Sequence, residues 1–555
     1  MSLDKLLNKS KTNYTVYTPL KVSREIVAKA LSLYFKGNKK RKLESIRAVD
    51  LCCGNGNLLI VLLESLIRIH KIYHGKYDYK KKWIEGYDLD SKVLEELRNR
   101  AKEIFDKYGI SGDINIFNED SLMIPNSKSY NLIIGNPPYL GEKNNREIFE
   151  KIRLTEFGQK YYEGKMDYLY FFIEKGIELL KKDGVLALVL PSELLQVKFT
   201  EEIREYLKRQ FQRIEIYTFN DLMFDCKGQD TIVLIAFKEH NEKGEFFTNI
   251  KLKEELENNS FTLKENNLLV DSNVKWTHHF LKSDELNFLD NLKQKLKSVD
   301  YYTDSKPGIV TAANNFFIIN KEIEKKYNLS KYTRPIIQKG FFVNGSVVFD
   351  KKNIEELEQS NHPTRLLQLN DNDKISEKLS EYLSIGTEQK IQERYKCKIR
   401  NNWYVIPNIS TIPDALFFKR CHNYPKLLKN TSSALVTDSA YKVNMKAKWD
   451  LNSFIFSFYN SLTLVFAETD GRYYGGGVLE LTPREFKKLP IPYIQISAND
   501  FEKFTHDFEN KENIEEILSK NDKIILKQVL NLNDEEIIKI KMIRKKLIDK
   551  RMKKK

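Results

Sequence analysis

Short apolar runs alternate with amphipathic helical patterns over residues 42–237. Helical periodicity, with apolar residues every three or four positions, is clearest in Leu58 to His70, Ser91 to Tyr108, Tyr168 to Lys181 and Glu201 to Gln210. The runs that read as strands are Ile46 to Leu51, Trp83 to Tyr87, Ile114 to Phe117, Leu132 to Ile134, Val185 to Leu190, Ile214 to Phe219 and Thr231 to Phe237. Strands and helices that alternate in this way predict an open, parallel α/β sheet flanked by helices.

The pattern changes twice further along the chain. From residue 244 to 497 the sequence is rich in Asn, Lys, Tyr and Phe, with short strand-like runs such as Gly345 to Phe349, which predicts a separate mixed α+β domain. Residues 498–555 read as almost wholly helical and end in the basic run Arg544 to Lys555. A charge run of this kind is often a solvated or disordered tail, and that interpretation stays open. We therefore predict domains at residues 1–243, 244–497 and 498–555.

Composition narrows the classes of protein that fit. A chain of 555 residues, 41% of them hydrophobic, can bury more than one core. The net charge of +15 favours a polyanionic partner such as nucleic acid, although lysine-rich surfaces also occur without one. The five cysteines are scattered without Cys-x-x-Cys spacing, so neither a disulfide framework nor a metal site is indicated. No apolar stretch is long enough for a membrane span, and we expect a cytoplasmic protein.

A turn with two glycines follows the first predicted strand. It runs from Asp50 to Gly56 and leads into a helix. Residues without a Cβ let the chain bend sharply and bring its backbone close to a ligand, although two glycines alone also suit an ordinary tight turn. The third glycine of the dinucleotide pattern is absent, which disfavours a nicotinamide cofactor.

Acidic residues follow the next two predicted strands. Asp88 lies where a ribose diol would bind, and Asp120 offers a carboxylate to the amino group of an adenine ring. Either carboxylate would also suit a helix cap. Because glycines, an acid and a second acid follow three successive strands, we favour a site for a nucleoside-containing cofactor.

The fourth strand runs into Asn136-Pro137-Pro138-Tyr139. The prolines fix φ and remove two backbone donors, which leaves the Asn136 side-chain oxygen and the Pro137 carbonyl as acceptors. Two acceptors on the hydrogens of an aromatic amine pull it toward tetrahedral geometry and raise its reactivity. Tyr139 supplies a flat face on which an extruded base can stack. The loop predicts methylation of a planar amino group, with no covalent intermediate and no metal.

Taken in order along the chain, these motifs resemble the gamma-class (Taq-type) DNA adenine methyltransferases of bacterial restriction–modification systems. The residues that carry the resemblance are Tyr17-Thr18-Pro19, Asp50 to Gly56, Asp88, Asp120, Asn136 to Tyr139, Lys165 to Phe172, and Gly184 to Ala187 with Pro191. The resemblance implies a Rossmann-like, seven-stranded methyltransferase domain that uses S-adenosylmethionine.

The same resemblance assigns roles to individual residues. Tyr17, Thr18, Pro19, Asp50, Cys52, Gly54 and Gly56 would surround the methionine moiety, Asp88 the ribose and Asp120 the adenine, with Asn136 beside the cofactor. Phe224 matches a second stacking aromatic, unless it is an ordinary core residue. The sequence departs from the family pattern at Leu51, where Pro is usual, and at Cys52, where Ala is usual; both changes keep the size class.

The second half of the chain resembles the target-recognition region of the same family more loosely. The matching segments are Gly308 to Phe317, Arg472 to Gly477 and Leu489 to Pro492. Arg472, Tyr473 and Tyr474 would suit either a DNA contact or an ordinary glycine-rich hairpin. The side chains that read bases stay open, because readout depends on geometry.

Other enzymes share the catalytic loop. Protein-glutamine methyltransferases acting on release factors and some RNA methyltransferases also methylate planar amino groups, but about 300 further residues demand a second task here. Only about 17 residues precede Thr18, so we expect any cognate restriction endonuclease to be a separate partner. A binding protein on a decayed fold would have lost Asn136 or the acids, and all are present. The sequence thus predicts a methyltransferase acting on the 6-amino group of a flipped adenine in double-stranded DNA.

Overall fold

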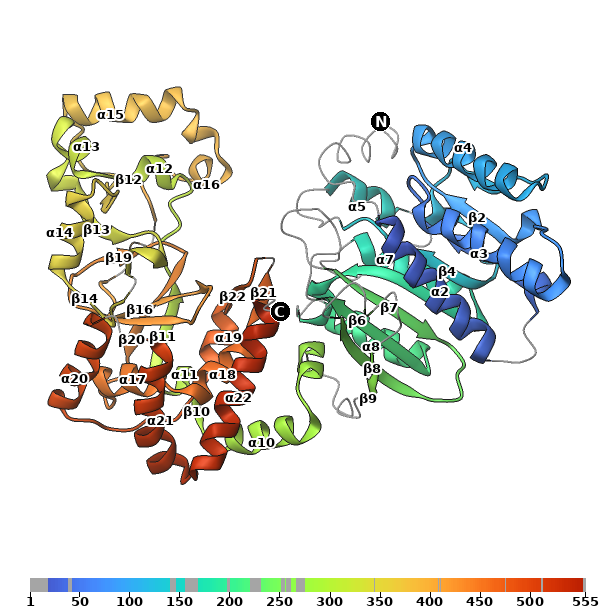
Figure 1. Cartoon of the computed structure of the whole chain (residues 1–555). Coiled ribbons are helices and arrows are strands. Elements are labelled where there is room, and N and C mark those ends of the chain that lie inside the picture. Colours follow the sequence, from blue (N-terminus) through green and yellow to red (C-terminus); the bar gives the residue numbers. More distant parts are fainter. Residues whose placement is uncertain are drawn as a thin grey trace. The chain divides into compact units, whose positions relative to one another are not determined.

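The computed structural model describes residues 18–37, 42–139, 146–154, 168–196, 200–219, 231–250, 255, 261–265, 275–343, 345–407, 409, 411–474, 476–510 and 513–552. The chain forms two compact units that divide between Ser283 and Asp284 (Figure 1). Among the described residues, no helix combines the length and the apolar character that a membrane crossing requires.

The first unit is built on a sheet whose described strands number nine, in the order β3-β2-β1-β4-β5-β7-β6-β8-β9. Its strands are β1 (Ala48–Asp50), β2 (Ile84–Tyr87), β3 (Asn115–Phe117), β4 (Tyr130–Gly135), β5 (Leu180–Pro191), β6 (Arg213–Phe219), β7 (Thr231–Phe237), β8 (Gly244–Ile250) and β9 (Lys264–Glu265). The seven strand runs read from the sequence correspond to β1 to β7, and β8 and β9 extend the sheet beyond them.

The sheet is not parallel throughout, which corrects one prediction. Strands β1 to β5 pair in parallel, but β7 runs antiparallel to both β5 and β6. A parallel partner has to be reached by a crossover of a dozen or more residues, usually through a helix. Only residues 220–230 separate β6 from β7, so an antiparallel return is the natural connection.

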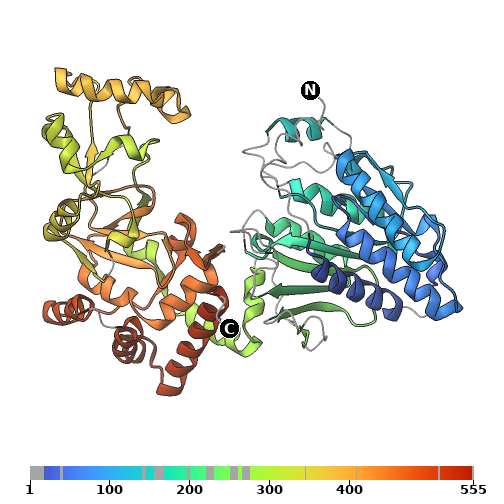
Figure 2. The ribbon, with the colours of Figure 1, turned by 45° about the horizontal axis from the view of Figure 1, so that its top comes forward.

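Helices cover both faces of this sheet, as Figures 1 and 2 show for α2, α3 and α4 on one side. The helices are α2 (Leu20–Gly37), α3 (Asn57–His74), α4 (Ser91–Tyr108), α5 (Arg146–Arg153), α7 (Tyr168–Leu179) and α8 (Glu201–Gln210). Successive strand residues point to opposite faces. Ala48 and Leu132 therefore join a core with α2, α3 and α4, whereas their neighbours Val49 and Ile133 join a core with α5, α7 and α8.

The first unit extends beyond the boundary that the sequence predicts at residues 243 and 244. Strand β8 pairs in parallel with β6 from Gly244 to Ile250, so this segment is part of the sheet. Its burial alternates only weakly, and its charged and polar residues resemble the Asn- and Lys-rich texture that follows. Composition changes at this point of the chain, but the compact unit continues to Ser283.

The second unit mixes short strands with helices (Figure 1). Its sheets are β11 (Thr303–Pro307), β20 (Ala440–Met445), β16 (Ala415–Phe418), β18 (Lys426–Asn430) and β14 (Val348–Phe349); β12 (Ile318–Ile319), β15 (Arg365–Leu367), β13 (Thr333–Ile337) and β19 (Leu435–Val436); β17 (Arg420–Cys421), β22 (Val478–Glu480) and β21 (Arg472–Tyr474); and β10 (Lys297–Ser298) with β23 (Pro490–Ile491). Its helices are α10 (Ser283–Gln294), α11 (Val299–Tyr302), α12 (Asn314–Phe317), α13 (Lys321–Lys326), α14 (Lys351–Gln359), α15 (Glu377–Glu388), α16 (Tyr395–Lys398), α17 (Leu451–Phe458), α18 (Ser461–Asp470), α19 (Pro483–Lys488), α20 (Ala498–Glu509), α21 (Ile514–Leu530) and α22 (Asp534–Arg551).

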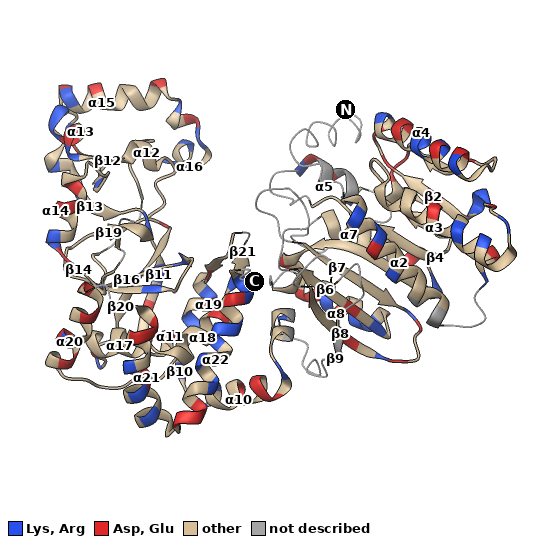
Figure 3. Ribbon diagram, viewed as in Figure 1, with Lys and Arg blue, Asp and Glu red and all other residues tan. Residues whose placement is uncertain are grey.

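The basic run at the end of the chain is part of a packed helix up to Arg551, and not a solvated tail. Helix α22 carries charges of both signs (Figure 3), yet Ile540, Ile543 and Leu547 are buried. Arg551 is also buried, and its guanidinium pairs with both carboxylate oxygens of Glu468 in α18 at 2.8 Å. The charge pattern misleads because Arg551 belongs to the buried face, where a partner 83 residues away in the sequence neutralises it.

Candidate active site

The predicted cofactor residues meet where the strand order reverses. Strand β1 lies between β2 and β4, and the carboxyl ends of these three strands are followed by Asp50 to Gly56, by Asp88 and by Asn136. In open α/β sheets, ligands bind outside the carboxyl ends of strands at such a reversal. Three motifs separated by more than thirty residues in the sequence thus lie at one edge of the sheet.

The glycine turn requires its glycines for conformational and packing reasons. Gly54 and Gly56 have φ values of +52° and +80°, in the left-handed region that side chains disfavour. A Cβ on Gly56 would lie 2.1 Å from a methyl carbon of Leu97 in α4, so any other residue would force Leu97 to shift. Helix α3 begins directly after Gly56, so its unpaired N–H groups point toward the turn.

Asp88 holds the glycine turn in place. One of its carboxylate oxygens accepts from the Gly54 N–H at 2.9 Å, and the other accepts from the Asp90 N–H at 3.0 Å. The helix α4 that follows is capped by Asp90, whose carboxylate accepts from the Lys92 N–H. Asp88 is therefore not a helix cap; it joins the ends of β1 and β2.

Asp120 does act as a cap. Its side chain accepts from the Leu122 N–H at 3.0 Å, at the start of a short 3-10 helix (Ser121–Met123). Next along the chain, the Ser121 hydroxyl donates to the Leu51 carbonyl at 2.6 Å and ties this segment to the glycine turn. Burial raises the pKa of the Tyr168 hydroxyl, and the negative charge of Asp120 raises it further. The acid that the sequence assigns to an adenine ring is thus also a structural cap beside a buried tyrosine.

Thr18 carries a buried hydroxyl without a partner among the described residues. The residue is 4% exposed, and its Oγ1 makes no hydrogen bond. Its carbonyl accepts from the Asn57 side-chain amide at 2.8 Å. The Asn57 oxygen in turn accepts from Arg100 of α4 at 2.8 Å, and Arg100 also donates to the Asn55 carbonyl at 2.5 Å.

Sequence reasoning missed Asn57 and Arg100. They fix the segment at Thr18 against the start of α3 and the glycine turn, although nothing in their spacing marks them. Arg100 reads as one more charge on an amphipathic helix, and its role depends on the packing of α4 against α3.

The predicted catalytic loop is closed on itself. The Tyr139 hydroxyl donates to Asn136 Oδ1 at 2.9 Å and lies 3.0 Å from the Val189 carbonyl of β5. The Tyr139 ring packs against the core on the α7 face of the sheet. The acceptor that would hold an amino group is therefore engaged by Tyr139, and the ring is turned toward the protein.

Burial dominates the electrostatics beside this loop. It raises the pKa of Asp50 to about 7, and the charge of Asp88 also raises this pKa. The Cys52 N–H donates to the carboxylate at 3.0 Å and opposes the rise, because it favours the ionised form. Burial likewise raises the pKa of the Cys52 thiol, which accepts a hydrogen bond from the Asn136 backbone. A Cβ on Gly135 would lie 3.3 Å from Asp50 Oδ1, so the two motifs are in contact.

Several predicted features fall outside this geometry. Tyr17 and Phe224 lie outside the described residues. Pro19 directly precedes α2, and its carbonyl accepts from the Ser23 N–H at 2.9 Å. Pro137 is buried and Pro138 half-buried in the loop.

In the part of the chain that the structure describes, no cluster of His, Cys, Asp or Glu could hold a metal ion.

The hairpin read as a DNA contact is largely engaged within the second unit. Arg472 donates to Glu485 at 3.0 Å, and the Tyr473 hydroxyl donates to the Glu468 carbonyl at 2.8 Å. Tyr474 is exposed, with the Arg420 guanidinium 5.8 Å from its ring. Of the three residues, Tyr474 keeps an exposed face.

Within the segment from Gly308 to Phe317, residues 310–316 line a cleft of about 320 Å³ with residues of a second segment, including Gln389 and Arg394. Its backbone is strained at Ala312, which has φ +72° without being a glycine. Arg394 donates to the Ala312 carbonyl at 3.0 Å, and Arg400 donates to the Thr311 carbonyl at 2.9 Å.

The strand order 3-2-1-4-5-7-6 with an antiparallel β7 defines a methyltransferase-like α/β fold. Residues 26–224 match the family model of the Eco57I restriction-modification methylase, and residues 273–526 match that of the C-terminal domain of the type II methyltransferase M.Eco57I. The chain belongs to the Eco57I-type family of restriction-modification methylases.

Relatives align with most of the chain at low identity. The type II methyltransferase M.AccI of Acinetobacter calcoaceticus is 23% identical over 474 residues, which cover 80% of this chain and 84% of that protein. The type II restriction enzyme and methyltransferase RM.Eco57I of Escherichia coli is 23% identical over 369 residues. That match covers 56% of this chain and 36% of the longer relative.

Solved structures show the same fold. The type IIL restriction-modification enzyme MmeI, in complex with DNA, is similar with a TM-score of 0.58 and 13% identity over 99% of this chain and 76% of that one. The nuclease-deletion mutant of the type ISP restriction-modification enzyme LlaGI, with a DNA substrate mimic, gives a TM-score of 0.51 and 13% identity over 83% of this chain and 52% of that one. At these identities the likeness concerns the fold.

Proposed function

We propose that this protein is a site-specific DNA methyltransferase that transfers a methyl group from S-adenosylmethionine to the 6-amino group of an adenine flipped out of the duplex. The observation that carries the proposal is the position of Asn136. It directly follows β4, and its backbone hydrogen-bonds the Cys52 thiol of the glycine turn. A group that can activate an amine therefore lies beside residues that would hold the cofactor.

The residues present fit the proposed cofactor. Thr18 has a buried hydroxyl with an unused hydrogen-bonding capacity, and Gly54 and Gly56 give the turn its left-handed backbone. Thr18 and the Asp50 to Gly56 turn would hold the methionine moiety, Asp88 the ribose and Asp120 the adenine ring. When bound, S-adenosylmethionine supplies an electrophilic methyl group on a positively charged sulfur.

The loop residues perform the activation. Asn136 Oδ1 and the Pro137 carbonyl would accept the two hydrogens of the target amine, which localises its lone pair on nitrogen. The Tyr139 hydroxyl competes with the amine for the Asn136 oxygen, because the two are now hydrogen-bonded. We infer that Tyr139 turns from Asn136 toward the incoming base, and that one movement frees the acceptor and presents the stacking face.

DNA is the proposed substrate because of the second unit. It matches the C-terminal domain of a type II methyltransferase, and relatives named as type II methyltransferases align with most of the chain. The net charge of +15 suits a polyanion. The choice of adenine over cytosine rests on the resemblance of the catalytic loop, since the same acceptors would serve either amine. A separate cognate endonuclease remains a prediction.

Long-read sequencing of DNA from a methylase-deficient host that expresses the protein tests this function. We expect modified adenines within one sequence motif, and none in cells that express Asn136→Ala. The Asn136→Ala protein should still bind S-adenosylmethionine in calorimetry. Modified cytosines would correct the base assignment, and unmodified DNA together with a methylated release factor would transfer the activity to a protein substrate.

A further inference from the structure

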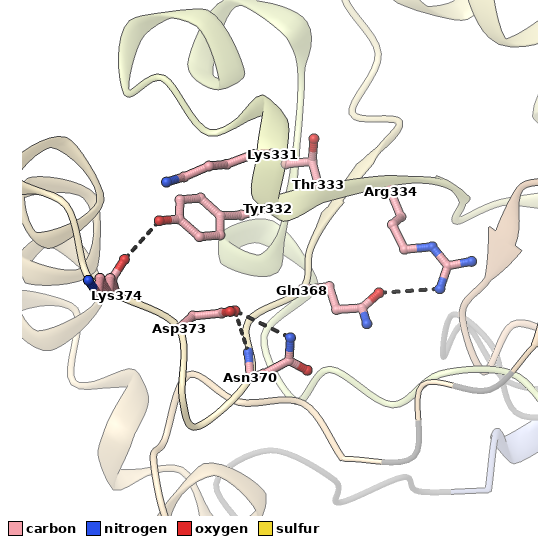
Figure 4. Close-up of a pocket in the computed structure, with 8 residues that line it drawn as sticks. All are labelled: Lys331, Tyr332, Thr333, Arg334, Gln368, Asn370, Asp373 and Lys374. Carbon is pink, nitrogen blue, oxygen red and sulfur yellow. Dashed lines mark hydrogen bonds between the residues drawn. The ribbon is translucent and has the colours of Figure 1, made fainter.

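A polar cleft of about 380 Å³ opens on the second unit between β13 and the segment that follows β15 (Figure 4). It is lined by Lys331, Tyr332, Thr333, Arg334, Gln368, Asn370, Asp373 and Lys374. The cleft has no counterpart in the motifs singled out from the sequence, because its residues carry no recognisable spacing.

The walls of the cleft are fixed by hydrogen bonds. The Gln368 N–H donates to the Tyr332 carbonyl at 2.8 Å and continues the pairing of β13 with β15. The Tyr332 hydroxyl donates to the Lys374 carbonyl at 2.8 Å, and Asp373 accepts from the Asn370 N–H at 2.8 Å. The backbone that carries these side chains is thus held in place before any ligand arrives.

Arg334 and Gln368 lie side by side at one end of the cleft (Figure 4). Arg334 reaches Gln368 Oε1 over 3.4 Å, which is a long and weak hydrogen bond. Both side chains are half-buried, and no carboxylate pairs with Arg334 among the residues that the structure describes. Arg365, on the strand paired with β13, differs because Glu358 neutralises it at an ion-pair contact of 2.5 Å.

The other cations of the cleft are also without carboxylate partners in the described structure. Lys331 and Lys374 are exposed, and the Lys331 ammonium lies 4.6 Å from the centre of the Tyr332 ring. Asp373 is the one acid that lines the cleft, and Asn370 engages it. Three cations against one acid give the cleft an excess of positive charge, which favours an anionic ligand.

We propose that this cleft reads the target sequence, with Arg334 and Gln368 contacting purine edges in the major groove and Lys331 and Lys374 contacting the flanking phosphates. The proposal rests on the proposed function. Arginine donates in a fork to the O6 and N7 of guanine, and glutamine pairs with the N6 and N7 of adenine. Because the contact between Arg334 and Gln368 is weak, each side chain can give it up and bind a base edge in its place.

The test compares Arg334→Lys, Arg334→Ala, Lys331→Ala and Lys374→Ala with the wild-type protein. Fluorescence anisotropy measures binding to two short unmethylated duplexes over a range of salt concentrations. One contains the sequence motif that the wild-type protein methylates, and the other has that sequence scrambled. Long-read sequencing of host DNA then gives the motif that each variant methylates. Lys352→Ala, an exposed lysine on α14 that does not line the cleft, is the matched control.

The two kinds of residue should respond differently. Arg334→Ala should lose about 5- to 150-fold in affinity for the motif duplex only, and its methylated motif should relax at one purine position. Arg334→Lys keeps the charge but not the fork, so its motif should relax as well. Lys331→Ala and Lys374→Ala should weaken binding to both duplexes alike and lower the salt slope by about 0.9 each. Lys352→Ala should match the wild type.

Two outcomes would overturn the assignment. An unchanged motif and affinity for Arg334→Ala would remove the cleft from target reading, and an equal loss on both duplexes would make Arg334 a phosphate contact. Wild-type protein that neither binds nor methylates DNA would refute the proposed function itself, which is a distinct result. Cofactor binding and thermal melting of each variant exclude misfolding as the cause.

Discussion

The Tyr139 hydroxyl donates a hydrogen bond of 2.9 Å to Oδ1 of Asn136, the atom that would accept the hydrogen of a target amine. The same hydroxyl lies 3.0 Å from the Val189 carbonyl, so the ring is held against the end of β5. In this state the Asn136 oxygen already accepts one hydrogen bond, and the Tyr139 ring is partly covered by the core. The contact therefore competes with the amine of an incoming base.

Tyr139→Phe should accelerate methyl transfer modestly. The change removes the competing hydroxyl and keeps the ring, so kcat/KM for DNA should rise about twofold to tenfold, the range expected for one net hydrogen bond. Tyr139→Ala also removes the hydroxyl that contacts Asn136 but loses base stacking, so its kcat/KM for DNA should fall about 5- to 150-fold. Steady-state transfer of a radiolabelled methyl group measures both, and a slower Tyr139→Phe enzyme would show that the hydroxyl takes part in the reaction.

Thr18→Val should separate cofactor binding from stability. The Thr18 hydroxyl has no partner to lose among the described residues, so the melting temperature without cofactor should stay equal or rise slightly. Affinity for S-adenosylmethionine should fall by about 1 kcal/mol, the value of one hydrogen bond. Thr277→Val is a matched control, because Thr277 also buries an unpartnered hydroxyl but lies outside the candidate site. Equal cofactor affinity in both variants, by calorimetry, would remove Thr18 from the site.

Asp50 should make the first unit less stable as pH rises toward neutrality. Its carboxyl keeps its proton in the folded state up to a pKa of about 7, whereas the unfolded chain loses that proton near pH 4. The contribution to the free energy of unfolding is thus largest below about pH 4 and falls by at most ~4 kcal/mol as pH rises to about 7. Urea unfolding between these pH values measures the slope.

Substitutions at two buried acids give that measurement its control. Burial also raises the pKa of Glu245 in β8 to about 7. Asp50→Asn and Glu245→Gln should each reduce the pH slope, but only Asp50→Asn should weaken cofactor binding. Loss of cofactor affinity in Glu245→Gln, or an unchanged slope in Asp50→Asn, would contradict this account.

Arg551→Ala should destabilise the second unit by about 3–5 kcal/mol, because it leaves the Glu468 carboxylate buried without its partner. The Arg551 guanidinium also donates to the Gly477 carbonyl, so the glycine-rich hairpin should loosen as well. Replacing both Arg551 and Glu468 by Met should cost much less, since no charge is then left unpaired. Lys545→Ala, an exposed change on the same helix, should be near neutral. Urea unfolding followed by circular dichroism measures all three, and a neutral Arg551→Ala would restore the interpretation of a solvated or disordered tail.

The sequence by itself determined the α/β alternation, the strand positions β1 to β7 and the order of glycine turn, acids and catalytic loop. It could do so because apolar periodicity is local, and because strand ends in such a sheet share one edge, which brings Asp50, Asp88 and Asn136 together. The antiparallel β7 and the addition of β8 were not readable, since pairing depends on chain return and not on composition. Phe224 and Tyr17, which lie outside the described residues, remain predictions.

Only the tertiary structure decided which polar residues work together. Arg100, Asn57 and Thr18 form one chain of hydrogen bonds across three elements, and Arg551 finds Glu468 across 83 residues. Arg334 and Gln368 meet because β13 pairs with β15. In the sequence each of these residues is simply one polar or charged position among many. A side chain acquires its partner, its burial and its pKa from neighbours that folding brings together, and local patterns carry no record of them.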